Sequence, residues 1–168
     1  MDARLTHLSC PTDIVDAPIE TVWSLVTDFA RWGDFYDIRV EKVEPPGLAR
    51  PGQRMTGNAG SRFLPMRVTF ECTEVDPARH NLKLFGWMPF GIEVRENMTM
   101  LRIDDTHCRV NYNCDFALPE GLRGKVLSFL LRRQFATGPA DSLARLKRAA
   151  ERAYSETPQH AGIRHRRQ

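Results

Sequence analysis

The strongest constraint on the fold comes from residues 38–118, where apolar and polar side chains alternate along six consecutive segments. Alternation with a period of two is typical of strands that are buried on one face and exposed on the other. Short turns rich in Pro, Gly, Asn and Asp separate the segments, so consecutive strands are expected to pair antiparallel. The predicted strands cover residues 38–44, 53–58, 66–75, 81–88, 92–103 and 107–118.

Each predicted strand has one apolar face. A sheet of such strands requires a cover on that face only, while its other face stays in water. In the third strand the apolar face carries Met66, Val68, Phe70 and Cys72, and in the last it carries Cys108, Val110, Tyr112, Cys114 and Phe116.

The cover is predicted to be a long helix over residues 122–154, where apolar residues recur at helical spacing. Gly138-Pro139 should kink or break this helix, because a proline removes one backbone hydrogen bond and clashes with the preceding turn. The stripe facing the sheet is expected to carry Val126, Phe129, Leu130 and Arg133, continued by Leu143, Leu146, Ala150 and Ala153.

The region before residue 38 predicts one strand over residues 5–15 and two short helical segments. Asp16 is expected to cap the first helix, with Pro18 in its first turn, and residues 30–36 form the second helix or a turn. The complete order is strand, two short helices, six strands and a long helix. This is an α+β layout, a curved antiparallel sheet of about seven strands packed on one long C-terminal helix.

Two motifs carry a family resemblance. Residues 16–32 read D-A-P-x-x-x-V-W-x-L-x-x-D-x-x-R-W, and residues 143–151 read L-x-R-L-K-R-A-A-E. With the order of elements, they resemble the helix-grip superfamily (SRPBCC, START-like or Bet v 1-like), which includes polyketide cyclases and aromatases, START lipid-transfer domains and the Bet v 1 allergens. The resemblance spans residues 5–154 and is closest to the bacterial polyketide cyclase/dehydratase-like branch. It implies one helix-grip domain over residues 1–154, but that branch has no universal catalytic motif to transfer.

The resemblance also implies a cavity between sheet and long helix, because a strongly bent sheet cannot touch a straight helix everywhere. Methionine and aromatic side chains suit the walls of such a cavity, although the same residues could simply fill a core. Aromatic residues near Gly33 and Gly91 are expected at its entrance. The predicted ligand-binding residues are Phe35, Tyr36, Met66, Val68, Phe70, Trp87, Met88, Met98, Met100, Val126, Phe129 and Leu130.

Three polar residues interrupt the apolar pattern and are the candidate catalytic residues. Glu96 either points inward with a raised pKa, as an acid or base, or is turned to water by a bulge or strand end. Arg133 either holds a ligand oxygen or extends to the rim. Tyr112 either offers its hydroxyl to a ligand or bonds to the backbone as a core residue.

Charge is uneven along the chain. Residues 123–168 hold 11 basic and 3 acidic side chains, whereas residues 1–122 hold 13 and 18. A solvated helix face explains the basic residues of the long helix, and residues 155–168 are expected to form a disordered basic tail. No recognition motif accompanies the charge, so nucleic acid is not an expected partner.

Cysteine and histidine patterns predict no metal site. The cysteines Cys10, Cys72, Cys108 and Cys114 form no C-x-x-C pair and are expected to be free, buried thiols. The five histidines are scattered, and no cofactor-binding motif is present, so neither metal nor cofactor is expected. The N-terminus lacks an apolar signal region, and no apolar run is long enough to span a membrane, which favours a cytoplasmic protein.

Two functions remain open from the sequence. The first is a cofactor-independent cyclase, aromatase or dehydratase that folds a polyketide-like chain in the cavity. The second is a carrier or sensor that binds a lipid, isoprenoid or aromatic metabolite without chemistry. Either function implies a hydrophobic small molecule as partner and no integral membrane contact, and a homodimer stays open. A weaker third hypothesis places the basic helix and the basic tail on nucleic acid or on a membrane surface.

Overall fold

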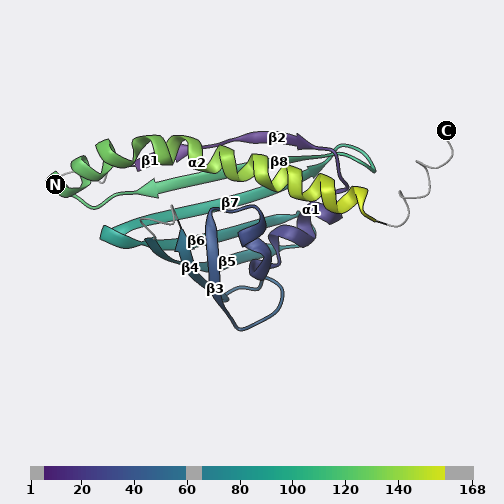
Figure 1. Cartoon of the computed structure of the whole chain (residues 1–168), viewed down its shortest axis with the longest axis horizontal. Helices are drawn as coiled ribbons and strands as arrows, with labels where there is room; N and C mark the ends of the chain where they lie inside the picture. Colours follow the sequence, from purple (N-terminus) through teal and green to yellow (C-terminus); the bar gives the residue numbers. More distant parts are fainter. Residues whose placement is uncertain (1–5, 60–65, 158–168) are drawn as a thin grey trace.

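The fold is a curved sheet crossed by one long helix (Figure 1). The computed structural model describes residues 6–59 and 66–157. Its strands are β1 (Thr6–Ser9), β2 (Thr12–Val15), β3 (Ile38–Glu44), β4 (Arg54–Ala59), β5 (Met66–Asp76), β6 (Asn81–Met88), β7 (Ile92–Arg102) and β8 (Cys108–Ala117). Its helices are α1 (Ile19–Val26), η1 (Phe29–Asp34), η2 (Pro89–Gly91) and α2 (Gly121–Ser155).

The eight strands form one antiparallel sheet in the order β1-β8-β7-β6-β5-β4-β3, with β2 also paired to β8. From β3 to β8 each strand pairs with its neighbour in sequence, as the short turns predict. The predicted boundaries agree with those observed to within one residue for all six strands. The predicted α+β helix-grip fold is therefore confirmed.

The first strand is interrupted, which gives eight strands where about seven were predicted. β1 and β2 both pair with β8, and residues 10 and 11 separate them. Pro11 has no N–H for the ladder, but its carbonyl accepts a bond of 2.9 Å from the Tyr112 amide. Both halves therefore stay on the same sheet edge.

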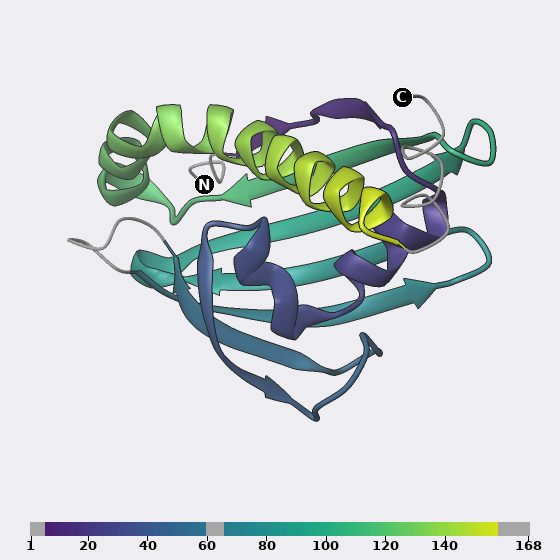
Figure 2. The same cartoon turned by 45° about the vertical axis from the view of Figure 1, so that its right-hand side comes forward.

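The two short helices follow β2 and cover one end of the sheet, beside the end of α2 (Figure 2). Helix α1 begins after Pro18, so the prediction that Asp16 caps it was wrong. Asp16 lies two residues before the N-cap, Pro18, and no side chain of the described residues caps the helix. Its own backbone N–H instead donates to Glu151 on α2, at 3.2 Å.

The core lies between the concave face of the sheet and the helices. The predicted inward residues of β5 and β8 are buried, apart from Met66, which is half-buried. On α2, Leu143, Leu146 and Ala150 are buried as predicted, and Ala153 is half-buried. Three of the four cysteines, Cys72, Cys108 and Cys114, are buried free thiols, whereas Cys10 is exposed.

The predicted inward stripe of the first half of α2 was wrong. Val126, Phe129 and Leu130 are 50%, 70% and 66% exposed, and Arg133 is also exposed. The residues that face the sheet are instead Leu127, Leu131 and Phe135. This half of the helix is apolar on two opposite sides, so periodicity alone could not identify the buried one.

Helix α2 continues through Pro139 without a break in its 35 residues. Figure 2 shows that the axis of α2 changes direction along its length, so the helix is bent rather than broken. No helix among residues 6–59 and 66–157 has the length and apolarity needed to cross a membrane. Helix α2 ends at Ser155, and residues 158–168 of the predicted tail lie outside the described residues.

Two glycines of α2 allow a matched test of how tightly its first turn packs. A Cβ at Gly124 would collide with the carbonyl oxygen of Pro119, whereas nothing lies within 4 Å of a Cβ at Gly138. We predict that Gly124→Ala lowers the free energy of unfolding by about 1–3 kcal/mol, because backbone cannot yield easily to the added methyl group.

Gly138→Ala is the control and should raise the free energy of unfolding by about 0.5–1 kcal/mol through helix propensity. Urea denaturation of both variants measures the two effects. Equal effects of the same sign would contradict the packing of α2 described above.

Candidate functional site

A cavity opens between the sheet and the middle of α2. Its volume is about 260 Å³. The apolar wall comes from Met66, Met88, Ile92, Phe116, Leu131 and Phe135, and the polar part from Tyr36, Asp37, Gln134, Thr137, Asp141, Ser142 and Arg145. Ala59 also lines it, and residues 60–65 that follow Ala59 lie outside the described part of the chain.

The space between sheet and helix is closed toward the other end of the sheet. There Phe35, Met98 and Tyr112 pack against Leu143 and Leu146 with no room for a water molecule. The predicted hollow is therefore only partly open, and side chains of the protein fill the rest. Tyr36 and Ser142 border both regions, and Tyr36 thereby links the cavity to the polar groups of the packed core.

Three polar side chains meet at this boundary. Glu96 projects from β7 and Tyr112 from β8, both toward the core, and Tyr36 follows η1. The Tyr36 hydroxyl donates a short hydrogen bond to Oε1 of Glu96, and the Tyr112 hydroxyl donates to the Tyr36 oxygen at 2.8 Å. Among the described residues, Oε2 of Glu96 has no hydrogen-bond partner. We call these three residues the Glu96 triad.

Burial dominates the electrostatics of the triad. Desolvation raises the pKa of Glu96 from 4.5 to about 7, although the hydrogen bond from Tyr36, and the Tyr112 hydroxyl next to it, oppose the shift. Desolvation, reinforced by the Glu96 charge, raises the pKa of both tyrosines well above 10. Near neutral pH the carboxyl group can therefore take up or release a proton, while the tyrosines remain hydrogen-bond donors.

This arrangement suits general acid–base chemistry. A group whose pKa lies near the working pH is the most effective proton donor and acceptor. Glu96 does not itself border the cavity, but Tyr36 does, and it holds the carboxylate through its hydroxyl. The triad can thus pass a proton between the buried carboxyl and a molecule in the cavity.

Strand parity explains why a carboxyl group is buried here. Ile92, Val94, Glu96, Met98 and Met100 occupy successive inward positions of β7, and all five are buried. Glu96 is 3% exposed, so of the two alternatives for its orientation the inward one is correct. No bulge interrupts the pairing of β7 with β6 or β8.

The predicted ligand-binding residues divide into three groups. Tyr36, Met66 and Met88 line the cavity. Phe35, Val68, Phe70, Met98 and Met100 are buried in the core. The third group faces solvent: Val126, Phe129 and Leu130 on the outer side of α2, and Trp87 on the outer face of the sheet.

Trp87 and Arg133 are the two orientation errors with the clearest cause. Gly86 occupies the inward position of β6, so its neighbour Trp87 faces outward. There the Trp87 and Phe85 rings make an edge-to-face contact, with their centroids 4.8 Å apart. Arg133 lies on the solvent side of α2 together with Phe129, away from the cavity. The arginine at the cavity is Arg145, which the sequence did not single out.

Arg145 stands at the polar part of the cavity. Its Nη1 lies 3.9 Å from Oδ1 of Asp37, and both side chains are about half-exposed. Ser142, one turn earlier, and Asp141 complete this polar edge. The signal for it was present in the sequence, since Ser142 and Arg145 immediately precede the correctly predicted inward residues Leu143 and Leu146.

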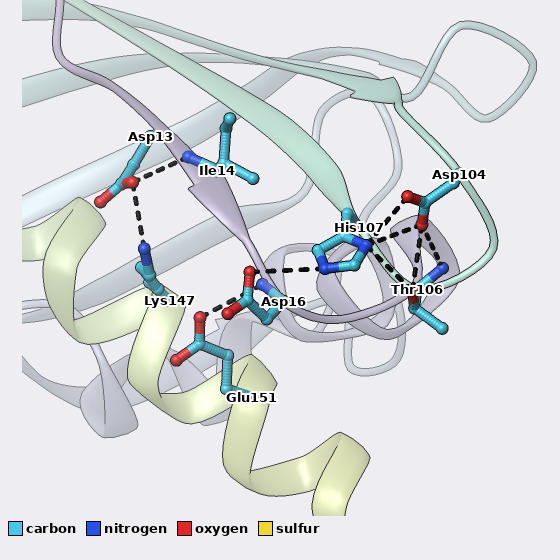
Figure 3. A network of polar contacts seen from close by, with 8 residues as sticks. All are labelled: Asp13, Ile14, Asp16, Asp104, Thr106, His107, Lys147 and Glu151. Atoms are coloured by element: carbon cyan, nitrogen blue, oxygen red, sulfur yellow. Dashed lines mark hydrogen bonds and ion pairs between the residues drawn. The ribbon is translucent and has the colours of Figure 1, made fainter.

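A second polar network lies at the end of the sheet away from the cavity (Figure 3). His107 Nδ1 lies 2.8 Å from Oδ1 of Asp104, and its Nε2 lies 3.8 Å from Asp16. Between helix α2 and β2, the Lys147 ammonium nitrogen lies 3.2 Å from Oδ1 of Asp13. These side chains are largely solvent-exposed and border no described pocket, so the network ties strands to the helix rather than forming a site.

Metal ligation finds no support in the described residues, which contain no group of three or more His, Cys, Asp or Glu side chains that could hold an ion. Burial raises the pKa of Cys72 and Cys108 to about 11 and that of Cys114 still further. Their thiols therefore stay protonated and are poor nucleophiles at neutral pH.

Glu96 should make stability fall as pH rises. Its pKa of about 7 in the folded protein exceeds the reference value of 4.5, so the folded state binds more protons between these values. Ionisation therefore destabilises the fold progressively over this window, by about 3 kcal/mol at completion. Glu96→Gln removes the ionisation and should become more stable relative to the wild type as the pH rises from about 4.5 to about 8.

Urea denaturation at a series of pH values measures this difference. The control is Glu71→Gln, which changes a carboxylate on the outer face that pairs with Arg54 at 2.8 Å. This variant keeps Glu96 and should therefore keep the decline in stability that Glu96 causes. A Glu96→Gln variant whose stability relative to wild type does not vary with pH would show that Glu96 ionises normally.

His107 provides an independent electrostatic prediction. Its hydrogen bond to Asp104 raises its pKa above 6.5, and contacts with Thr106 and His107 lower the pKa of Asp104 to about 2. In Asp104→Asn the His107 pKa should fall toward 6.5, as measured by NMR titration of the ring. An unchanged His107 pKa would mean that this pair does not persist in solution.

The sequence was compared with protein families and with curated proteins. Residues 12–151 match the family model described as polyketide cyclase / dehydrase and lipid transport. No curated protein matches the sequence.

Solved structures share the fold at low sequence identity. The Zhui aromatase/cyclase from Streptomyces sp. R1128 is 17% identical, with a TM-score of 0.71 over 92% of this chain and 99% of that chain. Norcoclaurine synthase from Thalictrum flavum, a point mutant with a transition-state analogue, is 12% identical, with a TM-score of 0.68 over 91% and 99%. The protein TTHA0849 from Thermus thermophilus is 19% identical, with a TM-score of 0.69 over 88% and 99%. Because the family match spans most of the sequence, from β2 into the last turns of α2, the chain belongs to the polyketide cyclase / dehydrase and lipid transport family.

Proposed function

We propose that the protein encloses a small hydrophobic molecule in the cavity beneath α2 and promotes its cyclisation or dehydration. The observation that carries this proposal is the Glu96 triad, a buried carboxyl with a pKa of about 7 joined to the cavity through Tyr36. Structural relatives that are an aromatase/cyclase and a norcoclaurine synthase support the same class of chemistry.

The cavity favours a compact ligand with one polar end. Its volume of about 260 Å³ lies just below the range of roughly 300–1,000 Å³ typical of small-molecule sites. A cavity of this volume suits a ligand with one or two carbon rings. Methionine and phenylalanine side chains would contact the apolar part. Tyr36 and Arg145 would face the polar end of the ligand.

In the proposed reaction Glu96 is the proton acceptor and donor, acting through Tyr36. Removal of a proton next to a ligand carbonyl gives an enolate, whose carbon attacks a second carbonyl of the same chain. The enolate oxygen would be stabilised by the Arg145 guanidinium at the polar edge of the cavity, because the Tyr36 hydroxyl is engaged in proton transfer to Glu96. The alkoxide formed in this attack takes the proton back from the triad and becomes a hydroxyl group. Dehydration then repeats the transfer: the triad removes the second proton from the attacking carbon and delivers it to the hydroxyl group, which leaves as water, so the protonation of the triad is unchanged at the end.

The experiment is reconstitution with a minimal polyketide synthase that releases a poly-β-ketone chain. Wild-type protein should shift the products toward one cyclised or aromatic compound. Glu96→Gln and Tyr36→Phe should lower this effect by about a hundredfold or more, the usual contribution of a general acid–base residue. Glu71→Gln, on the outer face, should act as wild type.

Binding must be measured beside turnover. A solvatochromic apolar dye, titrated into each variant, reports whether the cavity still takes a ligand. Variants that bind the dye as wild type but do not alter the products support the proposal. Wild-type protein that leaves the products unchanged, or variants as active as wild type, would contradict it.

A carrier is the second candidate. The family description includes lipid transport, and an apolar cavity suits transport without chemistry as well. Native mass spectrometry of protein purified from its own host separates the two. A single unaltered ligand that remains bound to wild type and to Glu96→Gln alike favours the carrier.

A further inference from the structure

The first half of α2 carries an apolar surface that packs on nothing in the described structure. Leu122, Val126, Phe129 and Leu130 are 78%, 50%, 70% and 66% exposed. Phe90, from the turn between β6 and β7, is 57% exposed and shares a surface groove with Leu122 and Val126. A contiguous patch of large exposed apolar side chains is typical of interaction surfaces. We call these five residues the α2 outer face.

Positive charge flanks the α2 outer face, and Arg133 lies on the stripe itself, one turn after Phe129 and Leu130, where its long side chain can extend to the headgroups. Between residues 121 and 140 the sequence has four basic residues, Arg123, Lys125, Arg132 and Arg133, and no acidic residue, while Glu120 precedes the helix. At 3.6 residues per turn, Arg123 falls on one flank of the apolar stripe, and Lys125 and Arg132 fall on the other. The Arg132 guanidinium lies 5.7 Å from the Phe129 ring, at the edge of the stripe.

This combination distinguishes between possible partners. A second copy docked through the same face would bring two sets of unbalanced cations together, which is unfavourable. A nucleic acid would neutralise the cations but leave the exposed leucines and phenylalanines without apolar contacts. An anionic lipid surface satisfies both, because apolar side chains enter the acyl region while lysine and arginine reach the headgroups.

We propose that the protein docks peripherally on anionic lipid bilayers through the α2 outer face. Leu122, Phe129 and Leu130 insert past the headgroups into the start of the acyl region, and the flanking arginines and lysine bind lipid phosphates. The inward side of the same helix segment supplies Leu131 and Gln134 to the cavity wall, so docking places the cavity next to the bilayer. This inference uses residues outside the Glu96 triad and stands independently of the proposed reaction.

Vesicle flotation with the full chain tests the proposal. The probes are vesicles of phosphatidylcholine alone and of phosphatidylcholine mixed with phosphatidylglycerol. Wild-type protein should float with the anionic vesicles only, and binding should weaken as salt screens the charges. The double variant Phe129→Ser/Leu130→Ser should lower the partition constant by about tenfold or more, because two apolar side chains no longer insert.

The matched control is Leu101→Ser/Ile103→Ser. These two side chains are each 50% exposed but belong to β7 and to the turn that follows it. This variant should float as wild type, and circular dichroism should show that both double variants are folded. The proposal is overturned if wild type stays unbound with anionic vesicles, if both double variants lose binding equally, or if an acidic protein or RNA binds the face while vesicles do not.

Discussion

One requirement dominates this structure: a large antiparallel sheet with a single apolar face must be covered by very few helices. Helix α2 crosses the concave face, and α1 with η1 fills one end (Figure 2). At that end Phe35, Met98 and Leu146 close the space completely, so the packing there is that of an ordinary core. Toward the first half of α2, side chains do not fill the space between helix and sheet, and the cavity lined by Met66, Met88 and Phe135 remains.

The chemistry is located where the packed core meets the cavity. An isolated carboxylate in a core is costly, and proteins respond by pairing it or by keeping it protonated. Glu96 does both in part, because Tyr36 donates to one oxygen while burial raises the pKa of the group to about 7. Such a residue contributes little to stability at neutral pH, which makes a functional role the better explanation for its position. Tyr112 then orients Tyr36 from behind.

The sequence predicted most of the fold because its signals were periodic and unambiguous. Alternation with turn residues located all six strands from β3 to β8, and the pairing followed from the short connections. It did not predict the orientation of the first half of α2, since Leu127 and Leu131 on one side and Phe129 and Leu130 on the other satisfy the same helical period. For the site, Glu96 and Tyr112 were identified as candidates, whereas their contact through Tyr36 depends on how η1 folds over the sheet, which no local pattern encodes.

The central claim is that Glu96 is a buried carboxyl which titrates near neutrality and is joined to the cavity through Tyr36. Its most direct test is NMR titration of the Glu96 side-chain carboxyl carbon in wild-type protein labelled at glutamate and assigned with Glu96→Gln. The account predicts one resonance with an inflection near pH 7, far from the reference value of 4.5, which should move toward still higher pH in Tyr36→Phe as the donor to the carboxylate is lost. An inflection at or below 4.5, unaffected by Tyr36→Phe, would mean that Glu96 is solvated, and the assignment of acid–base chemistry to this site would then be wrong.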